Sequence, residues 1–159
     1  MPDYIGERLL AAAMKYYGLK EVPGDQSNAE LLDIIKSVIS WADDDSTISW
    51  CGIFITYLFN ELGLNHLVPS RSYGARQWLN LERESVWAIG QEKYLISELA
   101  RPGDIVVFWR GSIDDWRGHV ALYINEYDGD RIRVLGGNQD NAVNIRAYNK
   151  ERILKIIRL

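Results

Sequence analysis

The hydrophobic periodicity of this chain changes from helical to extended near Val86. Before Val86, apolar residues recur at i, i+3, i+4 and i+7, as on one face of a helix. After it, short apolar runs are separated by turn residues, as in strands joined by hairpins. The chain is therefore expected to be an α+β protein, with N-terminal helices packed on a mostly antiparallel sheet of about six strands. Its 159 residues are expected to form one domain, 1–159.

Turn and capping residues set the expected element boundaries. Three helices are expected, over residues 3–17, 28–38 and 50–62, and a loop with a short helix is expected within residues 69–81. Strands are expected over residues 86–89, 105–110, 119–127, 131–136, 143–148 and 153–158. Asn28 and Ser49 are the expected N-caps, and Gly18 and Gly63 the expected left-handed stops. A turn is expected at residues 21–25, where proline is followed by glycine.

Cys51 is the only cysteine, and it begins the clearest amphipathic helix. A thiol in the first helical turn lies near unpaired backbone N–H groups and the positive end of the helix dipole, which favours a thiolate. Its position on the apolar stripe points it at whatever packs on that helix. A lone cysteine on an apolar face is, however, more often a small buried hydrophobe. A nucleophilic cysteine needs a base within reach, so the choice between these two roles depends on whether the rest of the chain supplies one.

A hairpin in the second half supplies a candidate base. Asp128-Gly129 between two apolar runs is a signal for a two-residue turn. Counting pairs back from that turn puts His119 opposite Asn138, so the two side chains share one face of the sheet. A one-residue bulge would bring Gln139 or Gly137 opposite instead. The rival base, His66, lies just past the end of the cysteine helix and is expected at the surface.

Composition and charge exclude several classes of function. The net charge of −4 argues against nucleic-acid and anionic-membrane partners, which usually need a basic patch. One cysteine and two histidines leave little for a metal site, and no cofactor is expected. The run of aspartates at 43–45 is expected to be a solvated turn, because it lacks the spacing of a calcium loop. No apolar run is long enough for a membrane span, and residues 1–17 do not form a secretory signal.

Four motifs follow one another along the chain: Ser49-Trp50-Cys51-Gly52-Ile53-Phe54, Pro102-Gly103-Asp104-Ile105-Val106-Val107-Phe108, Gly118-His119-Val120-Ala121 and Gly136-Gly137-Asn138-Gln139. Together with Glu21-Val22-Pro23-Gly24, they resemble CHAP amidases and NlpC-type cell-wall peptidases. The likeness is strongest to small bacterial and phage proteins with a Trp-Cys pair and a Gly-Gly-Asn-Gln turn. It covers nearly the whole chain.

This resemblance implies a papain-like catalytic domain in which the cysteine helix lies against the sheet that bears the histidine. By position, Cys51 is the expected nucleophile, His119 the general base and then acid, and Asn138 the orienting residue. The Cys51 backbone N–H is expected to contribute to the oxyanion hole. Trp50, Glu21 and Gln139 are candidates for substrate contact. Trp50 stands where relatives often carry glutamine or aspartate, so the side-chain oxyanion donor is unassigned.

The resemblance also implies a cysteine amidase or endopeptidase that cuts an amide bond of the peptidoglycan stem peptide through a thioester acyl-enzyme. Without a secretory signal, such a bacteriolytic enzyme is expected to be made in the bacterial cytoplasm. It would reach the periplasm or cell wall as a phage endolysin or an injected antibacterial effector, and an effector would need an immunity protein in its own host. Two alternatives stay open, an acyltransferase of the same superfamily and a non-catalytic wall-binding module.

Overall fold

The computed structural model describes residues 4–23 and 26–159. The start of the predicted first helix at residue 3, and residues 24 and 25 of the predicted turn, lie outside the described residues. The helices are α1 (Ile5–Met14), α2 (Ala29–Val38), α3 (Cys51–Glu61), α4 (Leu95–Leu99) and the 3-10 helices η1 (Asn65–Leu67), η2 (Ala75–Asn80) and η3 (Lys150–Arg152). The strands are β1 (Glu84–Ala88), β2 (Ile105–Trp109), β3 (Gly118–Glu126), β4 (Arg131–Gln139), β5 (Ala142–Asn149) and β6 (Ile153–Arg158).

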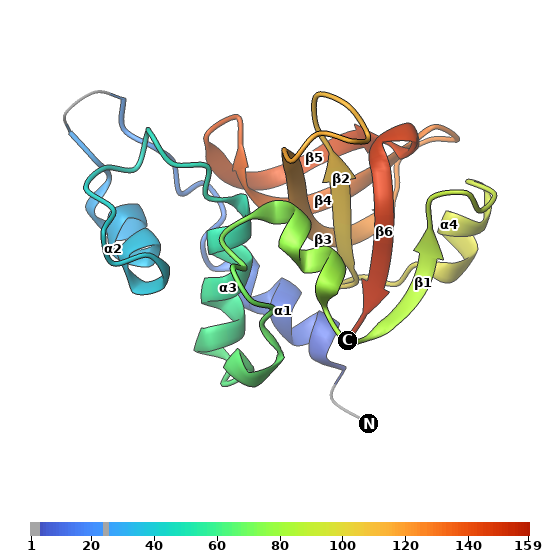
Figure 1. Cartoon of the computed structure of the whole chain (residues 1–159), viewed down its shortest axis with the longest axis horizontal. Coiled ribbons are helices and arrows are strands. Elements are labelled where there is room, and N and C mark those ends of the chain that lie inside the picture. The colour runs from blue at the N-terminus through green and yellow to red at the C-terminus, as the bar shows by residue number, and fades with distance from the viewer. Residues whose placement is uncertain (1–3, 24–25) are drawn as a thin grey trace.

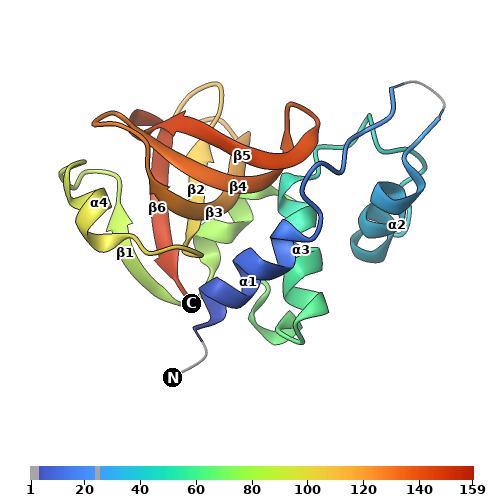
Figure 2. The same cartoon turned by 180° about the vertical axis from the view of Figure 1, so that it is seen from behind.

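Six strands form one antiparallel sheet in the order β1-β6-β2-β3-β4-β5. Helices α1 and α3 cover one face of this strongly curved sheet, and α4 lies beside β1 (Figures 1 and 2). Helix α2 packs on α3 and extends to the edge of the molecule farthest from β1 (Figure 1). The predicted α+β, papain-like arrangement, with the cysteine helix on the sheet, is therefore confirmed.

The sheet separates two clusters of buried apolar side chains. The larger lies between the sheet and helices α1–α3, and includes Phe54, Leu58, Val120 and Leu122. The smaller lies on the opposite face, where Phe108, Ala121 and Tyr123 point away from the helices. The alternation of β3 residues between the clusters is the period-2 pattern expected of a strand buried on both faces. In the described ranges, no helix has the length and apolar character needed to cross a membrane.

Most predicted boundaries agree with the structure to within a few residues, but the cap of the cysteine helix differs. Asn28 caps α2 as predicted, with its side-chain oxygen accepting from the N–H groups of Glu30 and Leu31. Gly18 and Gly63 have φ of 90° and 72°, the left-handed conformation predicted for helix stops. Ser49 is not the cap of α3. Trp50 takes that position and makes no side-chain capping bond.

The β3–β4 hairpin has the predicted register near its middle but not the predicted turn. Tyr127 and Asp128 both donate backbone N–H to the Arg131 carbonyl, so the loop holds three residues rather than two. Neither Asp128 nor Gly129 has the positive φ that a two-residue turn requires. A bulge between Tyr123 and Asn125 compensates for the extra residue. Beyond it, Leu122 pairs with Leu135, in the register counted from the sequence.

Candidate active site

Cys51 is the first residue of α3, and its side chain is buried. Helix starts leave backbone N–H groups without intrahelical partners, and at α3 no capping side chain takes them. Gly52 lets the chain of the 70–80 loop approach this turn, because a Cβ there would lie 2.6 Å from the Ser72 carbonyl oxygen. The cysteine is therefore held at a closely packed helix start whose N–H groups remain available.

The same helix start lies directly on the end of β4. A Cβ at Gly137 would lie 2.7 Å from the Trp50 ring and 2.9 Å from the Phe54 Cβ. Trp50 and Phe54 meet edge to face, with ring centroids 6.4 Å apart. The absence of a side chain at Gly137 thus lets the residues flanking Cys51 reach the strand that also carries Gln139.

His119 lies on β3, and its imidazole is bound to Gln139. The Nε2 of His119 is 2.9 Å from the Gln139 Oε1. The Gln139 amide nitrogen donates to the backbone oxygen and side-chain oxygen of Asn144, at 2.8 and 3.1 Å, so its Oε1 is the end that faces the imidazole. Because Oε1 only accepts, Nε2 carries the proton, and Nδ1 is the nitrogen free to act as a base.

The residue hydrogen-bonded to the imidazole is Gln139, whereas the sequence predicted Asn138 for that position. Pairing between β4 and β5 shifts by one residue between Gly136 and Gln139. Within that irregularity Asn138 adopts φ of 57°, in the left-handed region that asparagine tolerates. The irregularity interrupts the alternation of side chains along β4. The Gln139 side chain therefore lies on the same face of the sheet as the His119 side chain. Gln139 is also buried, and its contact with substrate stays a prediction.

Aromatic rings surround the imidazole. The Tyr148 ring stacks on His119 at a centroid distance of 5.2 Å, and the Phe108 ring lies 5.9 Å away. Burial among these groups lowers the pKa of His119 to about 4, against the opposing effect of the Gln139 hydrogen bond. The charges of Arg110 and Arg152 lower this pKa further. His119 is therefore neutral at pH 7, the state in which a base can accept a proton.

The second imidazole nitrogen is buried and unpaired. His119 Nδ1 has no hydrogen-bond partner among the described residues. His119 Nδ1 and the Cys51 sulfur are therefore not hydrogen-bonded to each other in this structure. Burial and, more weakly, the neighbouring Cys51 raise the pKa of Tyr148, the residue stacked on His119. Catalytic hydrogen bonds that are long or absent before substrate binds are common in enzymes.

Trp50 and Glu21 form a hydrogen-bonded pair at the start of α3. The Trp50 indole is fully buried, and its Nε1 donates to Glu21 Oε1 at 2.7 Å. Burial raises the pKa of Glu21, while the Trp50 hydrogen bond lowers it. The Trp50 ring has no exposed surface in this structure, and its contact with substrate stays a prediction. Glu21 holds the indole and stays half-buried.

The aspartate run before α3 has two separate roles. Asp44 forms a turn, accepting from the backbone N–H groups of Ser46 and Thr47. Asp45 is buried and accepts from the Asn28 backbone N–H at 2.8 Å, so the prediction of a solvated turn is wrong for this residue. In the described ranges, no group of three or more His, Cys, Asp or Glu side chains is placed to hold a metal ion.

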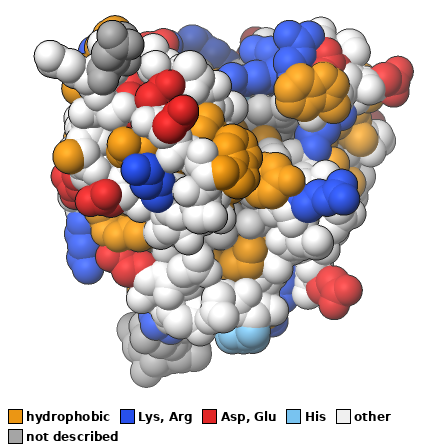
Figure 3. Space-filling view, turned by 60° about the vertical axis from the view of Figure 1, so that its left-hand side comes forward, with side chains coloured by type: hydrophobic (Ala, Val, Ile, Leu, Met, Phe, Trp, Pro, Cys, Tyr) orange, Lys and Arg blue, Asp and Glu red, His pale blue; other side chains and the backbone are white. Residues whose placement is uncertain are grey.

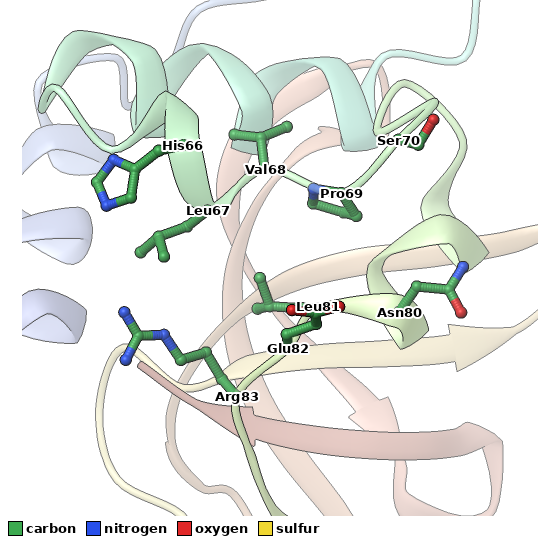
Figure 4. Close-up of a pocket in the computed structure, with 9 residues that line it drawn as sticks. All are labelled: His66, Leu67, Val68, Pro69, Ser70, Asn80, Leu81, Glu82 and Arg83. Carbon is green, nitrogen blue, oxygen red and sulfur yellow. The ribbon is translucent and has the colours of Figure 1, made fainter.

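His66 lines a pocket that does not include Cys51. Sequence analysis also predicted that His66 lies away from the cysteine. Figure 4 shows this pocket, of about 450 Å³, with Arg83 on the side opposite His66. His66 is exposed and belongs to η1, which follows the far end of α3. The eleven residues of α3 span about 16 Å. His66 is therefore not the base for Cys51.

The side of the molecule that carries α2 and α3 has a mixed surface. Figure 3 shows exposed hydrophobic side chains near the centre of this view, with Lys and Arg side chains gathered toward its upper right. Trp41, in the loop after α2, is 73% exposed.

Fold and site together define a papain-like α+β protein, with a cysteine at a helix start and an amide-oriented histidine on the sheet. The chain belongs to the CHAP domain family, whose model matches residues 43–138, more than half of its length. No curated protein matches the chain. CHAP domains are generally cysteine and histidine peptidases or amidases that act on peptidoglycan, so family membership indicates a peptidoglycan-hydrolase or amidase type of function.

Two residues near the imidazole were missed by sequence reasoning. Tyr148 was predicted only as the end of a strand, and Arg110 only as the residue closing β2. Tyr148 comes from β5, which is not adjacent to β3, so no pair of neighbouring strands in the sequence indicates the contact. Gln139 was named as the outcome of a bulge, and the consecutive glycines before Asn138 were the available signal for one.

Proposed function

We propose that this protein is a cysteine-dependent peptidoglycan amidase or endopeptidase, in which Cys51 is the nucleophile, His119 the base and Gln139 the positioning residue. The observation that carries the proposal is the buried pairing of His119 Nε2 with Gln139 Oε1, which leaves Nδ1 unpaired. A buried polar atom without a partner is costly, and active sites are where such atoms are retained. Family membership supports the same reaction type.

In the proposed reaction, the substrate brings the thiol and imidazole together. His119 Nδ1 accepts the Cys51 proton as the sulfur attacks the amide carbonyl, and backbone N–H groups at the start of α3 stabilise the oxyanion. His119 then gives the proton to the leaving amine, and the C–N bond breaks to leave a thioester. Water, deprotonated by His119, attacks the thioester and releases the carboxylic acid and the thiol.

Gln139 keeps the imidazole in the working tautomer throughout this cycle. Because its Oε1 accepts from Nε2–H, a proton at Nδ1 produces the imidazolium without any change in that bond. Asn144 fixes the amide of Gln139 in turn, since its side-chain nitrogen donates to the Gln139 backbone oxygen at 2.8 Å. The orientation of the base thus depends on a chain of contacts across β3, β4 and β5.

Digestion of purified peptidoglycan tests the proposal. The protein and its Cys51→Ala variant are incubated with cell-wall sacculi, and soluble products are identified by mass spectrometry. We expect products with one newly formed amine and one newly formed carboxylic acid from the unmodified protein only, and their masses identify the amide that is cut. Equal product release by a folded Cys51→Ala variant would reject Cys51 as the nucleophile.

The acyltransferase alternative is decided in the same assay. A transferase passes the acyl group to an added amine, so products would carry that amine in place of a free carboxylic acid. Cys51 lines none of the three pockets at Arg83, Arg101 and Tyr57. Water is the acceptor we propose, because family membership indicates a hydrolase type of function.

A further inference from the structure

Residues 72–78 are fixed to the helix that carries Cys51. The Thr56 hydroxyl of α3 lies 2.7 Å from the Ser72 hydroxyl and 2.8 Å from the carbonyl oxygen of Gly52. The Ser72 carbonyl oxygen accepts from the Trp78 Nε1 at 2.8 Å. Thr56, Ser72 and Trp78 are all buried. The segment therefore holds a fixed position relative to the helix turn that begins with Cys51.

Arg76, in the same segment, binds the loop that leads to His119. It belongs to η2, which lies between α3 and the strands β2 and β3 (Figure 1). Its guanidinium donates to three backbone carbonyls of the β2–β3 loop, at 2.8, 2.6 and 2.7 Å, those of Ser112, Ile113 and Arg117. Gly118 admits the Arg76 stem, since a Cβ at residue 118 would lie 3.0 Å from the Arg76 Cγ. Arg76 thus reaches the chain one and two residues before the proposed base.

The β2–β3 loop depends on hydrogen bonds for its position. All residues from 111 to 117 except Asp115 are exposed, and Trp116 is 85% exposed, so apolar burial contributes little here. A guanidinium presents its N–H donors in a rigid planar fork, and hydrogen bonds from a charged donor are stronger than neutral ones. Three such bonds from Arg76 therefore fix the loop, and with it the start of β3, against η2.

We propose that Arg76 is a positioning residue that sets the separation between Cys51 and His119. This inference rests on the proposed function and adds to it a residue that contacts neither the sulfur nor the imidazole. Because His119 Nδ1 and the Cys51 sulfur are not hydrogen-bonded to each other, the elements that carry them determine their distance. Arg76 joins those elements, through residues 72–78 on one side and the β2–β3 loop on the other. Reaction rates are sensitive to small misplacements of reacting groups, so this link matters for catalysis.

Cross-linking with dibromoacetone measures the separation without any substrate. The Cys51 sulfur displaces one bromide and His119 Nδ1 displaces the other, so a three-carbon bridge forms only when both atoms lie within its reach. Peptide mapping by mass spectrometry distinguishes the bridge from cysteine that is alkylated once. We expect the bridge to be the main product of the unmodified protein, and cysteine alkylated once to be the main product of Arg76→Gln.

Turnover of a soluble peptidoglycan fragment gives the second readout. Arg76→Gln should lower kcat by about 10–100-fold and change KM little, since misplaced reacting groups slow the chemical step rather than binding. Arg76→Lys keeps the stem and the charge but has no fork, so its bridging and kcat should be intermediate. It also supplies the comparison if Arg76→Gln does not fold.

Arg131→Gln is the matched control. Arg131 also holds a loop of β3, at the opposite end of the strand, through its exposed ion pair with Asp128. Its loss should leave the bridge and kcat unchanged. Full bridging and unchanged kcat in a folded Arg76→Gln, with only its thermal stability reduced, would overturn the inference and leave the proposed function intact. Absence of the bridge from the unmodified protein would overturn the pairing of Cys51 with His119, on which the proposed function itself depends.

Discussion

At the scale of a single residue, the burial of His119 should make the free energy of unfolding depend on pH. In the folded protein the pKa of His119 is about 4, whereas the pKa of a histidine in an unfolded chain is about 6.5. Between these values the unfolded chain binds more protons, so stability falls as pH drops from about 6.5 to 4. The contribution is on the order of 3 kcal/mol. Chemical denaturation at pH 7 and pH 4.5 measures this loss.

Replacing each histidine in turn isolates the effect. His119→Gln should make the loss of stability between pH 7 and pH 4.5 smaller by about 2 kcal/mol, since the titrating group is gone. His66→Gln is the control, because His66 is exposed and the chain has no third histidine. An identical pH dependence for His119→Gln and the unmodified protein would show that His119 is not the buried base described above.

Gln139 and Asn138 are distinguished by mutation. Gln139→Ala should lower kcat by about 100-fold, since the imidazole loses the acceptor that fixes its tautomer. Gln139→Glu should recover part of the activity with an altered pH profile, because a carboxylate also accepts from Nε2. Asn138→Gly is the control, since glycine keeps the φ of 57° and removes the side chain. A larger loss for Asn138→Gly than for Gln139→Ala would restore Asn138 as the orienting residue.

The choice between residues 138 and 139 as the partner of His119 could not be made from the sequence alone. Alternation along a strand predicts which residues share a face, and it correctly paired Leu122 with Leu135. One irregular residue reverses that assignment for everything beyond it. The bulge depends on the backbone contacts of Gly136 and Gly137 with neighbouring elements, which no local pattern records. His119, the proposed base, was identified from its motif, but the residue that binds its imidazole was predictable only to within one position.

At the scale of elements, helix α3 was predictable because its apolar positions repeat with helical spacing. The structure buries more of it than one stripe, since Ile53 and Phe59 are also inside. Residues 70–80 pack on the side of α3 that lies outside its predicted apolar stripe. Gly52 is the residue that admits this loop, and it was not predicted to matter.

Gly52→Ala should therefore destabilise the protein by about 1–3 kcal/mol and lower activity, because a methyl group would press on the Ser72 and Tyr73 carbonyl oxygens. Thermal denaturation and peptidoglycan digestion measure the two effects. Gly74→Ala is a matched control in the same loop, since its Cβ would meet nothing closer than 3.5 Å at a φ of −89°. Equal stability of both variants would contradict the close packing at the cysteine.

At the scale of the whole molecule, Asp104 joins both ends of the described chain. Its carboxylate is fully buried, and accepts from the Tyr4 hydroxyl at 2.6 Å and from the Arg158 guanidinium at 2.9 and 3.2 Å. Desolvation and the neighbouring carboxylate raise the pKa of Tyr4 to about 12, so the phenol stays a donor. Sequence reasoning did not predict this connection between the two ends of the described chain.

Asp104→Ala should lower the free energy of unfolding by about 3 kcal/mol or more, because it leaves the Arg158 charge and the Tyr4 hydroxyl without their acceptor. Urea denaturation measures this change. Asp128→Ala is the control, since that ion pair with Arg131 is exposed and worth about 1 kcal/mol or less. Similar losses for the two variants would show that the buried network does not hold the termini to the sheet.

The central claim, covalent catalysis by Cys51, is tested most directly by intact-protein mass spectrometry. The protein is mixed with a soluble peptidoglycan fragment, quenched in acid within the first turnover, and weighed. We predict a species heavier by the mass of the acyl portion of the fragment, located on the peptide that contains Cys51 and absent from Cys51→Ala. Turnover of the fragment without any acylated protein, or an adduct that persists in Cys51→Ala, would contradict the account.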